Sequence, residues 1–503
     1  MLDITSRWGR LASATDETEH RERAKADPGT YHGDIASREL HWFDDGSWVS
    51  RDADGHWQAL DTGTDASCDH PDDWRPWSKA LDDSDAPFYR WYRGAQTNAC
   101  FNEVDRHVLA GRGDAPALVF EGDRWDPSRN SGKGGPVQQI KVTYSQLLIE
   151  TVLRAEVLKS LGLGRGDRIA FNLPNILDQI YYTEAAKRLG IIYTPVFGGF
   201  SAKTLSARIY DAGATVVITA DGGYRNAEVV SYKEAYTDQA LGNFIPRLAA
   251  LDCLSQVLTT FDLGEAQNRI EALVAEQLAG EITLERSDVM RELGEALAQE
   301  HAIPAERSAE PRELAAVTHI AHTGVVVRYT VQDIVRHNRD RWSHDLVTQA
   351  TDNVLAVAAE AGHVCASTGE LEQLPARTLW QTLSAVHPAV PVESDYPLFI
   401  IYTSGSTGKP KGVVHTHGGW LAGIAHSMRM VFDAEDDDRI YVVGDPGWIT
   451  GQAYLIAAPL AIGISTVIAE GSPLFPHAGR FSSIIERHEA TIFKAGSTFL
   501  KAV

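Results

Sequence analysis

Cysteine is scarce in this chain of 503 residues. The four cysteines, Cys68, Cys100, Cys253 and Cys365, lie far apart, and none belongs to a CxxC pair. This spacing predicts neither a zinc site nor a disulfide framework, and it favours a reducing compartment, for which we expect the cytoplasm. The first residues, MLDITSRWGR, also lack a basic segment followed by an apolar run, which argues against a signal peptide.

Positive charge and long apolar runs are also limited. The chain has 46 Lys and Arg against 68 Asp and Glu, a formal net charge of −22. Such a surface repels nucleic acid and anionic membranes, so we expect neither as a partner, and a polyanionic ligand must be bound by local donors. The longest apolar segment, 453–469, is interrupted by Pro459 and Gly463. It predicts a buried helix and a buried strand rather than a membrane span.

What the sequence does contain is an alternation of strand and helix patterns. With 44% hydrophobic residues, the chain is long enough for more than one lobe. After an irregular first hundred residues, in which we expect short helices, the patterns predict helices at 144–161, 176–189 and 201–213 and strands at 168–174, 191–197 and 215–221. This order predicts an α/β fold with mostly parallel sheets covered by helices.

The middle of the chain has a different texture. Apolar residues at helical spacing predict two amphipathic helices, one with Ile270, Leu273, Val274 and Leu278 and one with Val289, Leu293 and Leu297. Their apolar faces could dock a partner, but packing on the chain's own core is the favoured interpretation. His319 and His322 could ligate a metal, yet no third ligand lies nearby, so ordinary turn histidines are favoured and no metal site is predicted.

The alternation returns at residue 396. A predicted strand at 397–402 runs into the stretch 402–412, YTSGSTGKPKG, and further strands are predicted at 438–445, 465–471 and 491–496 with helices between them. We therefore divide the chain into an N-terminal wrapping segment (1–100), a first α/β subdomain (101–241), a mostly helical insertion (242–395) and a second α/β subdomain (396–503). The stretch 402–412 is expected at the carboxyl edge of a parallel sheet, where open α/β sheets bind their ligands.

The composition of this stretch indicates a polyphosphate site. Glycines let the backbone approach a ligand closely, and successive N–H groups, hydroxyls and the Lys409 ammonium offer donors to one place. It is not a Walker loop, because only two residues separate Gly405 from Gly408, and Pro410 stands where a magnesium-binding Ser or Thr would be. A flexible surface loop is the alternative, which the composition and the preceding buried strand make less favoured.

The stretch YTSGSTGKPKGVVHTHGG resembles the phosphate-loop signature of the adenylate-forming acyl-CoA synthetases, and the segments FGGFSAKTL, ITADGGYR, GDPGWITGQAYLIAAPLAIG and EGSPLFP are similar to their acetyl-CoA synthetase branch. The resemblance implies the large N-terminal domain of these enzymes and the substrates ATP, with Mg²⁺, CoA and a carboxylic acid. It implies a reaction in two steps: the carboxylate attacks the α-phosphate of ATP, and the CoA thiol then attacks the acyl-adenylate.

The resemblance also assigns roles to residues. Lys409 would act in catalysis, and the β- and γ-phosphates would be bound by Thr403, Ser404, Gly405, Ser406, Thr407, Gly408 and Lys409. Trp448 and Ile449 would form the wall of the acyl pocket, and Arg225 and Thr450 would contact CoA. Two positions depart from the family pattern: Glu228 replaces a second arginine and Leu474 an asparagine near the CoA site, which puts the CoA contacts in doubt. His415 and His417 form an HxH pattern, for which a structural role is favoured over metal binding.

A narrower resemblance concerns the long interruption and the opening residues, which look like the ligase portion of propionyl-CoA synthases. These are multidomain fusions whose ligase activates 3-hydroxypropionate. The adenine-binding segment and the small C-terminal domain of the superfamily have no counterpart in the sequence, so we expect a truncated chain that is inactive alone and further domains in its parent. The alternatives are a plain acetyl- or propionyl-CoA synthetase with an insertion, or a non-catalytic scaffold that binds a nucleotide or a partner.

Overall fold

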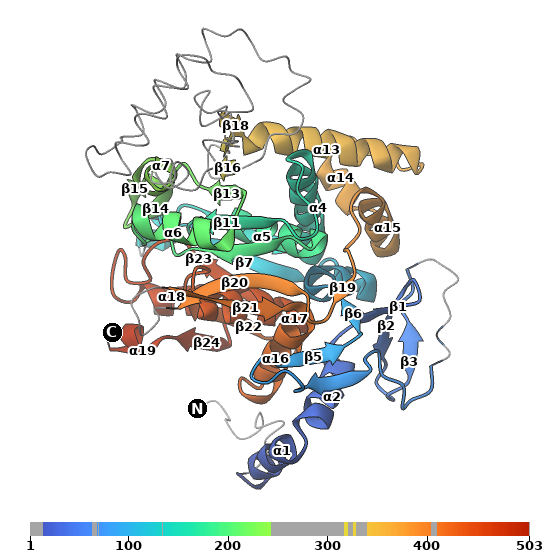
Figure 1. The fold of residues 1–503 in the computed structure, drawn as a ribbon. Helices are drawn as coiled ribbons and strands as arrows, with labels where there is room; N and C mark the ends of the chain where they lie inside the picture. The colour runs from blue at the N-terminus through green and yellow to red at the C-terminus, as the bar shows by residue number, and fades with distance from the viewer. Residues whose placement is uncertain are drawn as a thin grey trace, which may run out of the picture.

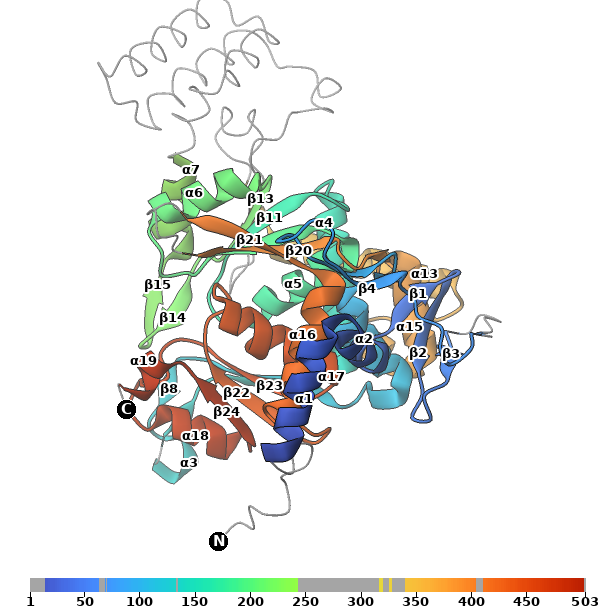
Figure 2. The ribbon, with the colours of Figure 1, turned by 60° about the horizontal axis from the view of Figure 1, so that its bottom comes forward.

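The computed structural model describes residues 14–62, 68, 70–132, 134–242, 316–319, 325–327, 340–403 and 410–501. The fold is α/β, as predicted: two large sheets with parallel strands at their centres are stacked with helices on their faces (Figure 1). In Figure 2, helix α5 lies between the strands of these two sheets. The two amphipathic helices expected around 270–278 and 289–297, and His322, lie outside the described residues.

The larger sheet has eight strands in the order β18-β17-β16-β13-β11-β12-β20-β21. Its five central strands are parallel, and the pairs β16–β17, β17–β18 and β20–β21 are antiparallel. The strands are β11 (Arg168–Asn172), β12 (Ile192–Pro195), β13 (Val216–Thr219), β16 (Ala316–His319), β17 (Val325–Val327), β18 (Asp340–Trp342), β20 (Pro397–Thr403) and β21 (Lys411–Thr416).

The second large sheet has the order β10-β7-β23-β22-β24. All its neighbouring strands are parallel except β10 and β7. The strands are β7 (Pro116–Glu121), β10 (Gln139–Thr143), β22 (Arg439–Val443), β23 (Ser465–Ala469) and β24 (Ile492–Ala495). Strand β7 thus pairs with a strand that begins more than 300 residues later, so the sheet joins the first third and the end of the chain.

The N-terminal residues form more regular structure than the sequence predicted. A five-stranded antiparallel sheet contains β1 (Trp42–Asp44), β2 (Ser47–Arg51), β3 (Trp57–Ala59), β6 (Gln96–Thr97) and β19 (Val392–Glu393). Three separate hairpins pair β4 (Lys79–Asp82) with β5 (Arg90–Arg93), β8 (Trp125–Asp126) with β9 (Gly135–Pro136), and β14 (Gly223–Arg225) with β15 (Glu228–Val230). The sheet was missed because its strands are too short to show an alternating pattern, and one of them follows the others by almost 300 residues.

The helices cover the sheets and the N-terminal edge of the molecule (Figures 1 and 2). The α-helices are α1 (Ala14–Ala26), α2 (Pro28–Glu39), α3 (Arg129–Gly132), α4 (Tyr144–Ser160), α5 (Leu177–Leu189), α6 (Ala202–Ala212), α7 (Gln239–Gly242), α13 (Ser343–Glu360), α14 (Thr368–Glu372), α15 (Ala376–Val386), α16 (His417–Met430), α17 (Ala458–Ile462), α18 (Arg480–Arg487) and α19 (Ser497–Leu500). Wider π-helical turns occur at η2 (Phe101–Asp105), η3 (Val108–Arg112), η4 (Lys233–Asp238) and η6 (Gly451–Ala457).

Local signals in the sequence fix several helix ends. Thr143 begins α4 with a capping box, in which its hydroxyl accepts from the Gln146 N–H and the Gln146 side chain accepts from the Thr143 N–H. Ser201 caps α6 by accepting from the Thr204 N–H. Gly190 ends α5 in a left-handed conformation.

Buried ion pairs connect the helix at residues 101–105 to α5. The Lys187 ammonium lies 2.6 Å from Glu103 and 2.7 Å from Glu184, and all three side chains are essentially inaccessible. Arg188 pairs with Asp105 at 2.7 Å next to them, also without solvent access. Burial and the neighbouring Glu184 raise the pKa of Glu103, while the Lys187 charge opposes that rise. The mutual pairing is what makes burial of these charges tolerable.

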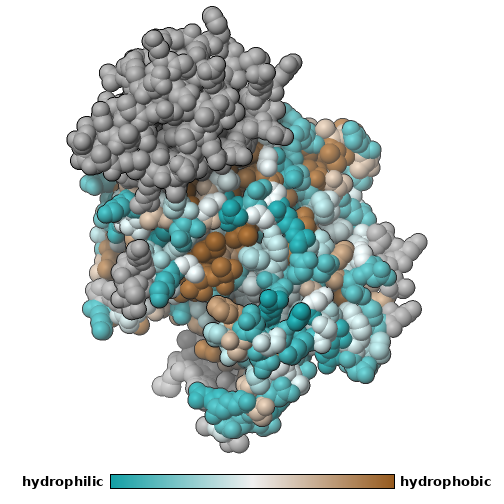
Figure 3. All heavy atoms as spheres, viewed as in Figure 1, coloured by the Kyte–Doolittle hydropathy of each residue, from teal (hydrophilic) through white to brown (hydrophobic). Residues whose placement is uncertain are grey.

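The space-filling view in Figure 3 shows an apolar area over β20 and β21. Val413 and Val414 of β21 are exposed. Among the helices that the structure describes, none combines the length and the apolar composition that a membrane crossing requires.

Candidate functional site

The predicted phosphate stretch connects two strands at the end of the eight-stranded sheet. Strand β20 ends at Thr403, and β21 returns antiparallel to it with Thr403 opposite Lys411 and Tyr402 opposite Gly412. Residues 404–409, which include Ser404, Gly405, Ser406, Thr407, Gly408 and Lys409, lie outside the described residues. The stretch therefore starts at the carboxyl end of a strand parallel to β12, as predicted, but a strand that was not predicted follows it.

The start of this stretch is held by α6. The Tyr402 hydroxyl donates a hydrogen bond of 2.8 Å to Asp211, and the guanidinium of Arg208 lies over the Tyr402 ring, 5.7 Å from its centroid. Arg208 also stacks on Phe200 at 4.0 Å from that ring's centroid. Because Phe200 lies 5.4 Å from the Trp448 ring, packed side chains run without interruption from the start of the phosphate stretch to the predicted acyl wall.

The predicted acyl wall lies in the turn after β22. Trp448 and Ile449 are both partly exposed, at 45% and 41%, and Trp448 packs against the rings of Phe197 and Phe200. The two segments approach so closely that a methyl group on Gly447 would lie 2.3 Å from the backbone nitrogen and α-carbon of Phe197. Only glycine fits at Gly447 without moving the backbone.

A cavity of about 360 Å³ lies beside this turn, between the carboxyl ends of strands from both large sheets. Asn175, after β11, bridges the two sheets by donating to the Gly444 carbonyl at 3.0 Å. The lining residues are Pro174, Asn175, Phe197, Gly198, Gly199, Tyr224, Arg225, Val230, Tyr232, Tyr236, Tyr441, Val442, Val443, Gly444, Asp445, Ala469, Gly471, Ser472 and Pro473. Of the two residues predicted to contact CoA, Arg225 lines this cavity. Thr450 instead precedes the helical turn η6 and lies next to Gly444, which lines the cavity.

The cavity holds an acidic group that the sequence did not single out. Asp445 follows β22, and its Oδ1 accepts a hydrogen bond of 2.7 Å from the Gly447 N–H. Burial raises the pKa of the Asp445 carboxyl to about 7, although the Gly447 N–H and the charge of Arg225 act in the opposite direction. Tyr232 lines the same cavity, and burial together with the Asp445 charge raises its pKa. Asp445 and Arg225 therefore place one titratable acid and one permanent cation on the walls of the same cavity.

Arg225 is carried by the hairpin β14–β15. In this hairpin, Glu228 is the residue directly opposite Arg225, and both side chains are exposed. Directly opposed residues share a face of the hairpin, so the carboxylate of Glu228 lowers the net positive charge next to the guanidinium.

The HxH pattern does not place its two rings in one environment. His415 stacks on Phe399 with ring centroids 4.7 Å apart, whereas His417 is buried and accepts a hydrogen bond from the Ala99 N–H at 3.1 Å. Burial lowers the pKa of His417 to about 3, so the ring is neutral at physiological pH. These contacts are structural, as the sequence favoured.

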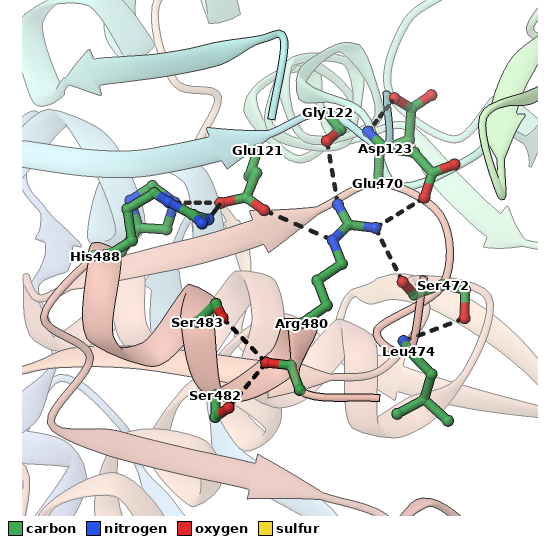
Figure 4. Close-up of polar contacts among 12 residues, drawn as sticks. Glu121, Gly122, Asp123, Glu470, Ser472, Leu474, Arg480, Ser482, Ser483 and His488 are labelled. Atoms are coloured by element: carbon green, nitrogen blue, oxygen red, sulfur yellow. Dashed lines mark hydrogen bonds and ion pairs between the residues drawn. The ribbon is translucent and has the colours of Figure 1, made fainter. Parts of the chain in front are cut away.

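A group of buried charged residues lies behind the hairpin that carries Arg225 (Figure 4). Asp123 follows β7 and Glu470 follows β23, and each accepts hydrogen bonds from backbone N–H groups of the hairpin. Arg480 at the start of α18 pairs with Asp123. Only the EGSPLFP segment signalled this region from the sequence, because the contacts join residues that are 104 to 357 positions apart.

Comparisons with known proteins agree with the fold. The family model for AMP-binding enzymes matches residues 105–503, and that for the acetyl-coenzyme A synthetase N-terminus matches residues 72–102. The chain belongs to the AMP-binding enzyme family, in the acetyl-CoA synthetase branch, as the sequence resemblance indicated.

The relatives include acetyl-coenzyme A synthetases from three bacteria. The chain is 33% identical over 433 residues to that of Thiobacillus denitrificans, which covers 86% of this chain and 48% of the relative. The values are 32% over 428 residues, 85% and 47% for Methylobacillus flagellatus, and 30% over 457 residues, 90% and 50% for Burkholderia mallei. The chain thus spans about half the length of the curated relatives it matches.

Proposed function

We propose that the protein is the AMP-forming acyl-CoA ligase portion of a larger enzyme and activates a short carboxylic acid, 3-hydroxypropionate, as the first step of propionyl-CoA formation. The observation that carries the proposal is the stretch 402–412, which has the composition of a polyphosphate site and follows the carboxyl end of β20. Membership of the AMP-binding family and the similarity to acetyl-coenzyme A synthetases support the reaction class.

The first step joins two anions, the carboxylate and the triphosphate of ATP. It depends on neutralising charge and on in-line placement, and needs no protein nucleophile. In our proposal Thr403 to Lys409 bind the β- and γ-phosphates and Lys409 offsets the charge that develops on pyrophosphate, with Mg²⁺ bound to ATP contributing further neutralisation. The carbon–oxygen–phosphorus linkage of the acyl-adenylate forms as the bond to pyrophosphate breaks.

The second step transfers the acyl group to the thiol of CoA and releases AMP. We assign the cavity of about 360 Å³ to CoA, because it brings Arg225 close to the turn that carries Trp448 and Ile449. In this assignment Thr450 lies at the entry of CoA, and Trp448, packed against Phe197 and Phe200, limits the length of the acid.

The absence of disulfides at Cys68, Cys100 and Cys365 supports our placement of the reaction in the cytoplasm.

The substrate assignment is tested with the full natural open reading frame that contains this chain. Thioester formation is measured with acetate, propionate and 3-hydroxypropionate, and we expect the highest kcat/KM with 3-hydroxypropionate. A preference for acetate or propionate would instead support the plain synthetase with an insertion. An open reading frame that continues into hydratase-like and reductase-like sequence is the result expected for the fusion.

A lysine substitution separates an enzyme from a scaffold. Lys409→Met should lower ATP–pyrophosphate exchange by about 100-fold or more, the usual cost of removing one charge-stabilising donor. Lys203→Met is the control, because Lys203 is an exposed lysine on α6. Unchanged exchange in the Lys409→Met protein, with intact folding, would contradict the proposed role of the stretch.

A further inference from the structure

Three carboxylates are buried where the second large sheet faces the hairpin β14–β15 (Figure 4). Glu121 is the last residue of β7, Asp123 follows that strand, and Glu470 follows its parallel neighbour β23; each is at most 1% exposed. Buried carboxylates without partners would be strongly destabilising, so each requires cations or N–H donors.

Arg480 supplies the central positive charge. Its side chain is fully buried, and its Nη1 lies 2.8 Å from Asp123 Oδ1 and donates to the Ser472 carbonyl at 2.9 Å. Nη2 donates to the Gly122 carbonyl at 3.1 Å, and Nε lies 3.6 Å from Glu121. The arginine therefore ties the residues after β7 and β23 into one unit.

The carboxylate of Glu121 has ion-pair partners on the side away from the hairpin. It pairs with Arg487 at 2.5 Å and with His488 at 2.9 Å. Burial alone would raise its pKa, but the His488 hydrogen bond and the charges of Arg487 and Arg480 outweigh burial, so the pKa is lowered and the carboxylate stays ionised.

Asp123 and Glu470 face the hairpin instead. Glu470 Oε1 accepts from the Tyr224 N–H at 2.8 Å, and Asp123 Oδ2 accepts from the Ala227 N–H at 2.8 Å. The two N–H groups lie on either side of Arg225 in the sequence. Glu470 Oε2 also accepts from the Asp123 N–H at 3.2 Å, which fixes the two carboxylates relative to each other.

The turn of the hairpin is conformationally unfavourable by itself. Asn226 and Ala227 have φ of 57° and 59°, the left-handed pair of a type I′ turn, in which the second residue is usually glycine. Alanine has no intrinsic preference for this region, so the hydrogen bond from its N–H to Asp123 opposes the strain. A methyl group on Gly471 would lie 2.0 Å from Asp123 Oδ1, so glycine is required there for the carboxylate to reach the turn.

We propose that Asp123, which is paired with Arg480, and Glu470 are positioning residues that hold the hairpin β14–β15 so that Arg225 faces the cavity and recognises a phosphate group of CoA. The inference rests on the proposed function of this cavity. Neither carboxylate lines the cavity, so each acts on CoA indirectly, through the hairpin backbone that it holds.

The test compares three isosteric variants in the full natural protein: Asp123→Asn, Glu470→Gln and Glu121→Gln. The first two substitutions each weaken a charge-assisted hydrogen bond to the hairpin. The third is the control, because Glu121 belongs to the same buried cluster but its carboxylate makes no contact with the hairpin in the described residues. We expect the KM for CoA to rise about tenfold in Asp123→Asn and Glu470→Gln, with ATP–pyrophosphate exchange unchanged, and to stay at the original value in Glu121→Gln.

A fourth variant tests the turn directly. Ala227→Gly should restore most of the CoA affinity when combined with Asp123→Asn, because glycine adopts positive φ without strain. Hydrogen-exchange mass spectrometry of the peptide 222–231 should show faster exchange in Asp123→Asn and slower exchange once Ala227→Gly is added. If Asp123→Asn does not fold, Glu470→Gln and the exchange of the same peptide decide the question.

Two results would overturn the inference: an unchanged KM for CoA in Asp123→Asn and Glu470→Gln, or an equal rise in Glu121→Gln. Calorimetric titration of CoA separates this inference from the proposed function. An unsubstituted protein that binds CoA but forms no thioester contradicts only the function, and the variants are then compared by their Kd for CoA. A protein that does not bind CoA overturns both.

Discussion

Asp445 should make the stability of the protein depend on pH in a direction opposite to that of most carboxylates. Its pKa is raised from 3.8 to about 7 in the folded protein, mainly by burial. Below about pH 4 the carboxyl is protonated in the folded and unfolded states and has no effect. Between about pH 4 and 7 the unfolded chain loses this proton while the folded chain keeps it, so the free energy of unfolding falls as pH rises, and above pH 7 the loss is complete.

The size of the effect follows from the pKa difference. About three pKa units correspond to a ceiling of about 4 kcal/mol at about 1.4 kcal/mol per unit. Because the side chain is partly exposed at the cavity, water screens part of the burial, and we expect about 2 kcal/mol between pH 5 and pH 8. Asp445→Asn keeps an oxygen that can accept from the Gly447 N–H but cannot ionise.

The measurement is urea unfolding of the unsubstituted protein and the Asp445→Asn protein from pH 5 to 8. Other titrating groups, such as His417, cancel in the difference between the two proteins. We expect Asp445→Asn to gain stability relative to the unsubstituted protein as pH rises. A difference that does not change with pH, or one that changes in the other direction, would refute the reasoning about the buried carboxyl.

Three further predictions follow from single contacts. Gly447→Ala places a methyl group against the backbone of Phe197, so we expect a loss of about 1–3 kcal/mol in urea unfolding and reduced thioester formation. Glu228→Gln removes the negative charge opposite Arg225, so calorimetry at low salt should show CoA binding about two- to fivefold tighter, with the gain lost at high salt. Lys187→Met leaves two buried carboxylates unpaired, so unfolding experiments should show a loss of about 3–5 kcal/mol.

The sequence predicted those elements whose signals are local. The helix expected at 176–189 is α5 (Leu177–Leu189), and the strand expected at 168–174 is β11 (Arg168–Asn172), because a glycine ends the helix and an apolar run marks the strand. The strand β21 was missed because it lacks such local signals. The segment KGVVHT is mostly exposed and does not alternate, and it forms a strand because it pairs with β20.

The candidate site was predicted as motifs, but its arrangement could not be. The family resemblance assigned Arg225 and Thr450 to the same ligand, but no residue pattern indicates that Asp445 shares a cavity with Arg225, since the two come from different sheets and are separated by 220 positions. Buried charges were missed for a related reason. A charged residue such as Arg480 resembles any surface residue in an amphipathic helix, and only the fold brings Asp123 to it.

The location of the cavity also bears on how an acidic protein can bind an anionic ligand. With a net charge of −22, the protein repels ATP and CoA at a distance, but at physiological salt this repulsion is screened within about 8 Å. Binding then depends on donors in direct contact with the ligand, and a rigidly held arginine loses less entropy when it binds than a mobile one. Because the carboxylate of Asp123 is already paired with Arg480, it can fix the hairpin without adding free negative charge to the cavity. The same arrangement explains why the positioning carboxylates lie behind the hairpin rather than beside Arg225, where they would compete with a phosphate for the guanidinium.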